Sequence, residues 1–206
     1  MLLAFLLLWG EGVFALTLEF TVRLERDGSG EAALEAEVSD QAAGILQELC
    51  RAEPGMAGLP FPPEREAVER FLAGVPGVEL EECRSFGQEG GLRRHVLRLR
   101  VREGEALLSS GALGAMVLQK PQGEAGIRVF QVPLPSPGEW TPRRIRCARM
   151  LLEALGGLEV RLTLEAPSPL LETTGRKDSA RRCRWLLDSA GWLQDTLPEI
   201  QASWRP

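Results

Sequence analysis

The clearest pattern in the chain is a strict alternation of apolar and polar residues that follows an apolar N-terminus. From 16 to 24 the apolar side chains occupy every second position, and the same period of two returns from 31 to 39. Asp27-Gly28-Ser29-Gly30 stands between the two arms, and glycine supplies the positive φ that a tight connection requires. The pattern predicts an antiparallel hairpin with one buried face and one charged face.

Further strands are predicted wherever short alternating or apolar segments recur. The turn expected at 88–91, Gln-Glu-Gly-Gly, joins two of them. The predicted strands are 78–84, 92–102, 127–132, 158–165, a strand through Cys183, Trp185 and Leu187, and a strand through Ile200, Ala202 and Trp204. With the hairpin they bring the expected total to about eight strands.

Helical spacing and end signals predict the helices. Asp40 is placed to cap a helix through about Arg51, and Pro62-Pro63 opens a second helix that Gly74 ends. A third runs from Thr141 to Leu155, and a short fourth lies near 103–109 before a glycine-rich connection at 110–126. The predicted fold class is therefore α+β, an antiparallel sheet of about eight strands with three or four helices packed on it.

The N-terminal segment has the features of a secretory signal. Its apolar run, Leu2 to Trp9, is too short to span a bilayer, and Val13 and Ala15 put small residues where a signal peptidase reads. We interpret 1–15 as a signal peptide cleaved between Ala15 and Leu16, with 16–206 as an exported domain that is secreted or periplasmic. A buried first strand or helix is the alternative for 1–15, and a division into two lobes near 110–126 is the alternative for the domain.

Cysteine usage agrees with an oxidising compartment. The four cysteines have no CxxC or CxxH spacing, so the sequence gives no support for a zinc site. Two disulfides are expected, and of the three possible connectivities we favour Cys50 with Cys83 and Cys147 with Cys183. Four buried free thiols are the alternative.

The charge balance excludes one class of partner. With 24 basic and 29 acidic residues the net charge is −5, which argues against nucleic acid because phosphate binding needs a basic field. Two groups of arginines are locally basic, and either could bind an anionic lipid headgroup or an anionic protein surface. The alternative is that these arginines only form a solvent-exposed face of the protein. The first group is Arg143, Arg144, Arg146 and Arg149, and the second is Arg176, Arg181, Arg182 and Arg184.

Recognisable catalytic chemistry is sparse. His95 is the chain's only histidine, lies on the parity of Leu97 and Leu99, and is expected to be a packed or edge residue. The sequence offers no GxSxG elbow, no glycine-rich phosphate loop and no calcium loop beyond a partial likeness at 27–30. We therefore predict no enzyme, no catalytic, cofactor-binding or metal residues, and no cofactor.

The order of the parts resembles a known family. The opening "LTLEFTVRLERDGSGEAALEAEVS", with the later "LEVRLTLEAP" and "CRWLLD", is similar to the domain of LppM-type exported lipoproteins. That resemblance implies a cell-envelope protein, in part linked to amphiphilic lipids, although this chain lacks the lipidated cysteine of that family. We expect an exported non-catalytic binding or envelope-associated protein whose partner is an unknown protein or an amphiphilic ligand. The alternatives are a carrier of an apolar or lipid-like ligand and a hydrolase with an unrecognised site.

Overall fold

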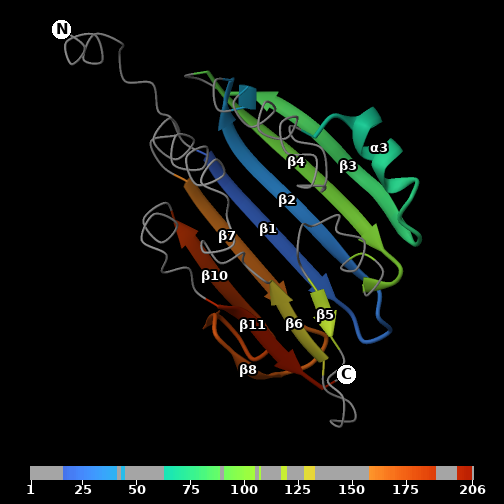
Figure 1. Ribbon diagram of the computed structural model, residues 1–206, viewed down its shortest axis with the longest axis vertical. Helices are drawn as coiled ribbons and strands as arrows, with labels where there is room; N and C mark the ends of the chain where they lie inside the picture. The colour runs from blue at the N-terminus through green and yellow to red at the C-terminus, as the bar shows by residue number, and fades with distance from the viewer. Residues whose placement is uncertain are drawn as a thin grey trace, which may run out of the picture.

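The computed structural model describes residues 16–40, 43–44, 63–88, 91–104, 107, 117–119, 128–132, 158–188 and 199–205. In this part of the chain, strands dominate and assemble into one sheet of seven strands and one of four. Figure 1 shows the long strands of the larger sheet running side by side across the molecule.

The large sheet is mixed. Its strands in spatial order are β3 (Val78–Gly87), β4 (Leu92–Val101), β2 (Gly30–Ser39), β1 (Leu16–Leu24), β7 (Leu158–Glu165), β10 (Arg182–Asp188) and β9 (Arg176–Lys177). β1 and β7 pair in parallel, from Leu16 opposite Leu158 to Arg23 opposite Glu165, and the other neighbours are antiparallel. The two halves of the chain thus meet at the centre of one sheet.

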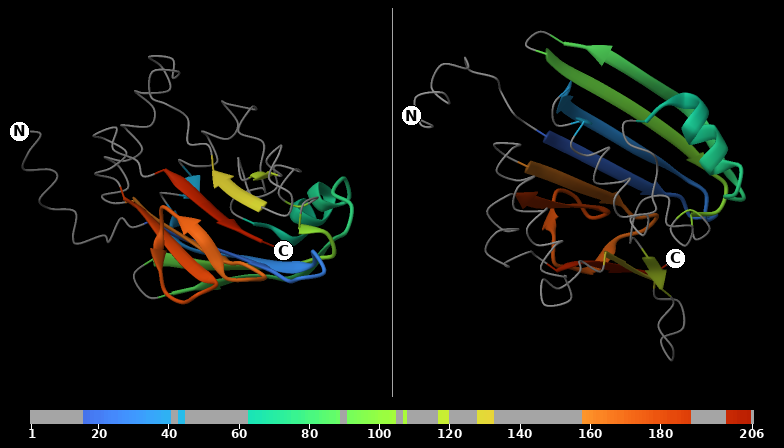
Figure 2. Two further views of the ribbon diagram at one scale, coloured as in Figure 1. Left: turned by 90° about the horizontal axis from the view of Figure 1, so that it is seen from below. Right: turned by 45° about the horizontal axis from the view of Figure 1, so that its top comes forward.

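The small sheet lies across one face of the large sheet (Figure 2). It contains β5 (Val117–Gln119), β6 (Arg128–Val132), β11 (Ile200–Trp204) and β8 (Leu170–Thr173), in that spatial order. β8 is an edge strand of the small sheet and β9 an edge strand of the large one. Because only Thr174 and Gly175 separate them, the chain passes between the sheets at this edge.

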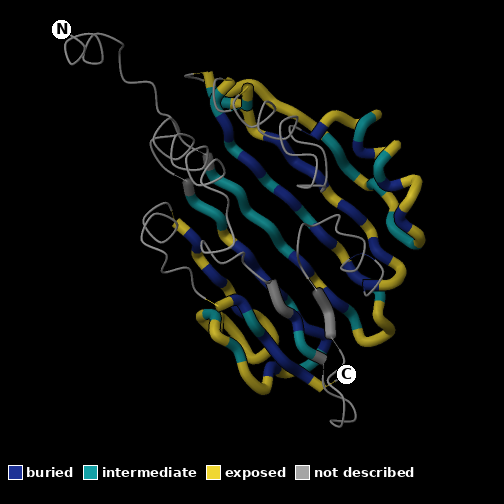
Figure 3. Tube along the Cα trace, viewed as in Figure 1, coloured by how far each residue is buried: buried dark blue, intermediate teal, exposed yellow. Residues whose placement is uncertain are grey.

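The core lies between the two sheets. Buried residues alternate with partly buried ones along β2 and with exposed ones along β10, as Figure 3 shows, so that one face of each strand meets the core. Phe130 on β6 and Trp185 on β10 bring the sheets together, with ring centroids 6.2 Å apart. Burying an apolar side chain of this size stabilises the fold by about 1.5–3 kcal/mol.

The helix α3 (Arg65–Leu72) confirms the expected element after Pro62-Pro63. Val68 and Leu72 are one turn apart and buried, and the helix lies beside β3 at the edge of the large sheet (Figure 1). It ends at Ala73, and the amide of Gly74 donates to the carbonyl of Phe71. The other three expected helices fall wholly or mostly outside the described residues.

The opening hairpin is confirmed in full. β1 and β2 pair from Leu16 opposite Val38 to Leu24 opposite Gly30. Gly28 takes a φ of 86°, and a Cβ on Gly30 would lie 2.2 Å from the carbonyl oxygen of Arg23. Glycine is therefore required at both positions, once for conformation and once for space.

The predicted α+β class is wrong. In the described residues the chain is mostly β, with two sheets in place of one antiparallel sheet and with α3 as the one helix whose bounds are described. Three strands were not foreseen: β5 lies in the stretch expected to be a connection, and β8 and β9 occupy 170–177. These strands are two to four residues long, too short for a period of two to mark them. The apolar face of the large sheet is covered in part by the second sheet, where helices were expected.

Candidate anion-binding site on the β9–β10 hairpin

The second arginine group of the sequence lies on one hairpin at the edge of the large sheet. We call residues 176–184, which contain β9, the turn after it and the start of β10, the arginine hairpin. It carries five cations and one carboxylate, Asp178, so its net charge is 5 − 1 = +4 within a chain of net charge −5. The first arginine group, 143–149, lies outside the described residues.

Backbone pairing and turn hydrogen bonds fix the positions of these side chains. The amide of Asp178 donates to the carbonyl of Arg182 at 2.9 Å, and the hydroxyl of Ser179 accepts from the amide of Arg182 at 3.1 Å. Cys183 and Trp185 face the core, so Arg182 and Arg184 project from the opposite, outer face. Arg176 lies directly opposite Arg184 in the register, and like charges facing each other across strands repel.

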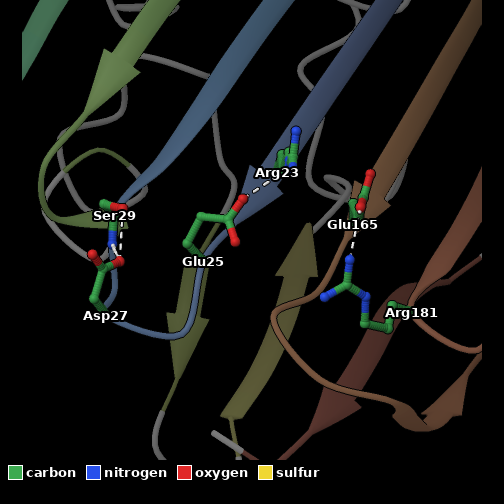
Figure 4. Close-up of polar contacts among 6 residues, drawn as sticks. All are labelled: Arg23, Glu25, Asp27, Ser29, Glu165 and Arg181. Carbon is green, nitrogen blue, oxygen red and sulfur yellow. Dashed lines mark hydrogen bonds and ion pairs between the residues drawn. The ribbon is translucent and has the colours of Figure 1, made fainter.

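Two of the five cations have acidic partners. Arg184 contacts both carboxylate oxygens of Asp178, at 2.6 and 2.9 Å. The hydrogen bond from Arg184 lowers the pKa of Asp178, and the charges of Arg184, Arg176 and Arg182 add to that effect. Arg181 extends toward Glu165, with Nη2 3.3 Å from Oε1 (Figure 4).

The other cations of the hairpin have no such partner among the residues that the structure describes. Among the described residues, Arg176 and Arg182 have no carboxylate within ion-pair distance, and Lys177 Nζ donates to the carbonyl of Leu170 at 3.4 Å. Leu186, two residues beyond Arg184 on the same outer face, is 55% exposed. Within the part of the chain that the structure describes, the hairpin therefore presents uncompensated positive charge beside an exposed apolar side chain.

The arginines of β4 are a contrast within the same sheet. They lie between strands rich in glutamate, and the described residues pair each one with a carboxylate. The pairs are Arg93 with Asp40 at 2.6 Å, Arg94 with Glu35 at 2.5 Å, Arg98 with Glu82 at 3.5 Å and Arg100 with Glu81 at 2.5 Å. This part of the outer face is a neutralised ladder and offers no comparable site for an anion.

The partial likeness to a calcium loop at 27–30 has a local explanation. Asp27 Oδ1 accepts from the amide of Ser29 at 2.9 Å and from its hydroxyl at 2.7 Å (Figure 4). These hydrogen bonds from Ser29 lower the pKa of Asp27. Its carboxylate closes the turn between β1 and β2, a common use of aspartate. Within the described residues, no three metal-ligating side chains converge.

The structure describes two of the four cysteines. Cys83 on β3 is half-buried and its thiol donates to the carbonyl of Pro63 at 3.4 Å, while Cys183 on β10 is buried. Both thiols are free in the structure, and burial raises the pKa of each. Cys50 and Cys147 lie outside the described residues, so the two expected disulfides stay a prediction.

His95 is a buried residue of β4, 4% exposed, as the parity of the strand indicated. The sequence did not reveal its neighbour: the hydroxyl oxygen of Ser85 on β3 lies 2.8 Å from His95 Nδ1. The signal that could have found this pair is the register of the β3–β4 hairpin, in which Ser85 and His95 are directly opposite. Of the predicted cleavage site, Ala15 lies outside the described residues and Leu16 is the first residue of β1.

Together these observations define a two-sheet β-protein with a basic hairpin at one edge. None of the helices described is long and apolar enough to cross a membrane. No family model and no curated protein matches the chain. Among solved structures it is similar to the NMR structure of the folded domain of LppM from Mycobacterium tuberculosis, at 13% identity and a TM-score of 0.49, over 96% of this chain and 93% of that one. The resemblance to LppM-type proteins predicted from the sequence is confirmed as a structural similarity.

Proposed function

We propose that this protein is an exported binding protein of the cell envelope, which docks on anionic membrane surfaces through the arginine hairpin. The observation that carries the proposal is that Arg176 and Arg182 lack carboxylate partners among the described residues, beside the exposed Leu186. The signal-like segment at 1–15 supports export, because a leader of this kind directs a chain out of the cytoplasm.

The expected docking is weak and sensitive to salt. A basic side chain near an anionic bilayer contributes about 1 kcal/mol, so Arg176 and Arg182 together contribute about 2 kcal/mol. Partial burial of Leu186 adds on the order of 1 kcal/mol, since full burial of a leucine is worth about 1.5–3 kcal/mol. A free energy of about 3–4 kcal/mol corresponds to reversible association, and salt above physiological strength screens its electrostatic part.

Vesicle flotation with the full chain tests the proposal. We expect the protein to float with phosphatidylcholine vesicles that contain phosphatidylglycerol, and to float poorly with phosphatidylcholine alone. Arg176→Gln and Arg182→Gln should each lower the partition coefficient about fivefold, because about 1 kcal/mol is lost. Raising the salt to about 1 M should abolish the difference between the two vesicle types, since the Debye length falls to about 3 Å.

Arg100→Gln is the matched control. It removes the same charge from the same sheet, but from a side chain already paired with Glu81. We expect it to change binding less than twofold. Equal binding to neutral and anionic vesicles, or an equal effect of Arg100→Gln and Arg182→Gln, would contradict the proposal.

A further inference from the structure

A serine and a histidine meet at the opposite edge of the large sheet from the arginine hairpin. Ser85 on β3 and His95 on β4 are cross-strand neighbours, and Ser85 Oγ lies 2.8 Å from His95 Nδ1. β3 is the edge strand here, and the described residues leave its outer side without a further strand. The pair belongs to no part of the proposed docking surface.

The ladder between β3 and β4 brings these two side chains close together. The amide of Gln88 donates to the carbonyl of Leu92 at 2.8 Å, so 88 and 92 form a hydrogen-bonded pair. Hydrogen-bonded and non-hydrogen-bonded pairs alternate along an antiparallel ladder, which makes Ser85 and His95 a non-hydrogen-bonded pair. Side chains approach most closely at such pairs, and this explains the short contact.

The environment of His95 favours the neutral form of its ring. The ring is buried beside Ala36 on β2 and Leu97 on its own strand. Burial lowers the pKa of His95, and the positive charge of Arg93 lowers it further. In the neutral tautomer that carries its proton on Nε2, Nδ1 accepts the hydrogen bond from the hydroxyl of Ser85, and in this tautomer His95 can act as a base toward a nucleophilic serine.

Ser85 itself is accessible. It is exposed, although its histidine partner is buried. In a non-hydrogen-bonded pair the backbone amide points away from the partner strand, so the amide of Ser85 faces the open edge. An amide beside the attacking hydroxyl is one of the donors that stabilise the oxyanion in acyl transfer.

We propose that Ser85 is a nucleophilic serine that is acylated by activated esters, with His95 as its general base. Ser85 Oγ attacks the ester carbonyl carbon, a new C–O bond forms, and the bond from that carbon to the leaving oxygen breaks. His95 Nδ1 takes the hydroxyl proton and delivers it to the leaving alcohol or phenol. The products are Ser85 as an acyl ester and the free alcohol, without any oxidant or metal.

The chain contains a matched control hydroxyl. Ser29 is also accessible at the surface and also donates a short hydrogen bond, 2.7 Å, to a potential base, Asp27. Hydrogen bonds lower the pKa of that carboxyl, so it is a poor acceptor of a proton at neutral pH. Reaction at Ser85 but not at Ser29 would separate activation by histidine from simple exposure.

The experiment treats the full chain with p-nitrophenyl acetate and, separately, with a fluorophosphonate, and locates adducts by peptide mass mapping. We expect a single adduct on Ser85, none in Ser85→Ala, and a rate about 100-fold lower in His95→Asn, in line with the usual contribution of a general base. Asparagine retains a hydrogen-bonding atom near the position of Nδ1 but cannot act as a base.

A second measurement does not depend on the folding of the His95 variant. The wild-type chain is labelled in buffer and again in concentrated urea, and the ratio of Ser85 to Ser29 adducts is compared. We expect a ratio of at least about 10 in buffer, as a minimal contribution of a base, and near unity in urea. Similar labelling of the two serines in buffer, or an unchanged rate in a folded His95→Asn, would overturn the proposal. Neither result bears on membrane docking, because the arginine hairpin lies at the other edge of the sheet.

Discussion

Replacement of Gly175 by alanine tests how the two sheets are joined at the hairpin edge. Gly175 lies between β8 and β9, and its amide donates to Thr173 Oγ1 at 3.0 Å. A Cβ at this position would lie 2.7 Å from Cε2 of Trp185 and 2.8 Å from the carbonyl oxygen of Arg184. Carbon atoms do not approach so closely without displacement, so either the indole or the backbone of β10 must move.

The cost of that movement follows from what Trp185 contacts. The indole is 3% exposed, packs against Phe130, and donates from Nε1 to Thr174 Oγ1 at 3.0 Å. Overpacking a core typically costs about 1–3 kcal/mol, and loss of the indole hydrogen bond costs about 1 kcal/mol. We therefore expect Gly175→Ala to lower the free energy of unfolding by about 2–4 kcal/mol, a large part of the 5–15 kcal/mol typical of a domain.

Urea denaturation followed by tryptophan fluorescence measures this loss. With an m value of about 2 kcal/mol/M, the midpoint should fall by about 1–2 M. Gly87→Ala is the control, because a Cβ on Gly87 meets no atom within 4 Å and its φ lies outside the positive range. It should change the free energy of unfolding by less than about 0.5 kcal/mol. Equal midpoints for the two variants would refute the packing described for Trp185.

Three further outcomes are expected. The pKa of His95, the chain's only histidine, is lower in the folded chain, so the unfolded chain binds more protons below about pH 6.5. The free energy of unfolding should therefore fall as the pH drops from 7.5 to 5, and urea denaturation at each pH should show a smaller fall for His95→Asn. Leu97→Ala removes a side chain that is 1% exposed and should cost about 2–5 kcal/mol in urea denaturation, whereas Leu186→Ala on the outer face should cost less than about 0.5 kcal/mol. Sequencing the protein recovered from its native host should find Leu16 at the N-terminus, and recovery of intact Met1 from the cytosol would contradict the export part of the proposed function.

The sequence was a reliable guide where a strand is long and has one face in the core. Alternation marked β1, β2, β4 and β7, because the period of two survives over eight to ten residues. It did not mark β8 and β9, which are four and two residues long and are held in place by pairing with a neighbouring strand. β8 pairs with β11, and β9 pairs with β10 through Lys177 opposite Cys183. Such strands exist because their partners present a free edge, which is not a property of their own sequence.

The sequence also could not predict which arginines form ion pairs. A run of cations in the sequence is visible, but the partner of each depends on where distant carboxylates lie. Glu165, at the end of β7, reaches Arg181, and Asp178 inside the turn reaches Arg184. Arg182 lies between Arg181 and Arg184 in the chain and has no ion pair in the described residues. The sequence of the hairpin alone could not show which of these arginines are paired with a carboxylate.

The Ser85–His95 contact depends on the register between β3 and β4. The sequence predicted strands at 78–84 and 92–102 with a turn at 88–91, and this prediction did not set which residues of the two strands lie opposite each other. In the structure β3 continues to Gly87 and Gln88 already pairs with Leu92, so that His95 faces Ser85. Since a shift of one residue also exchanges the faces of a strand, it decides whether the hydroxyl meets the ring or points away from it. Turn composition located the hairpin, but only the three-dimensional pairing brought a hydroxyl and a buried imidazole within hydrogen-bond distance.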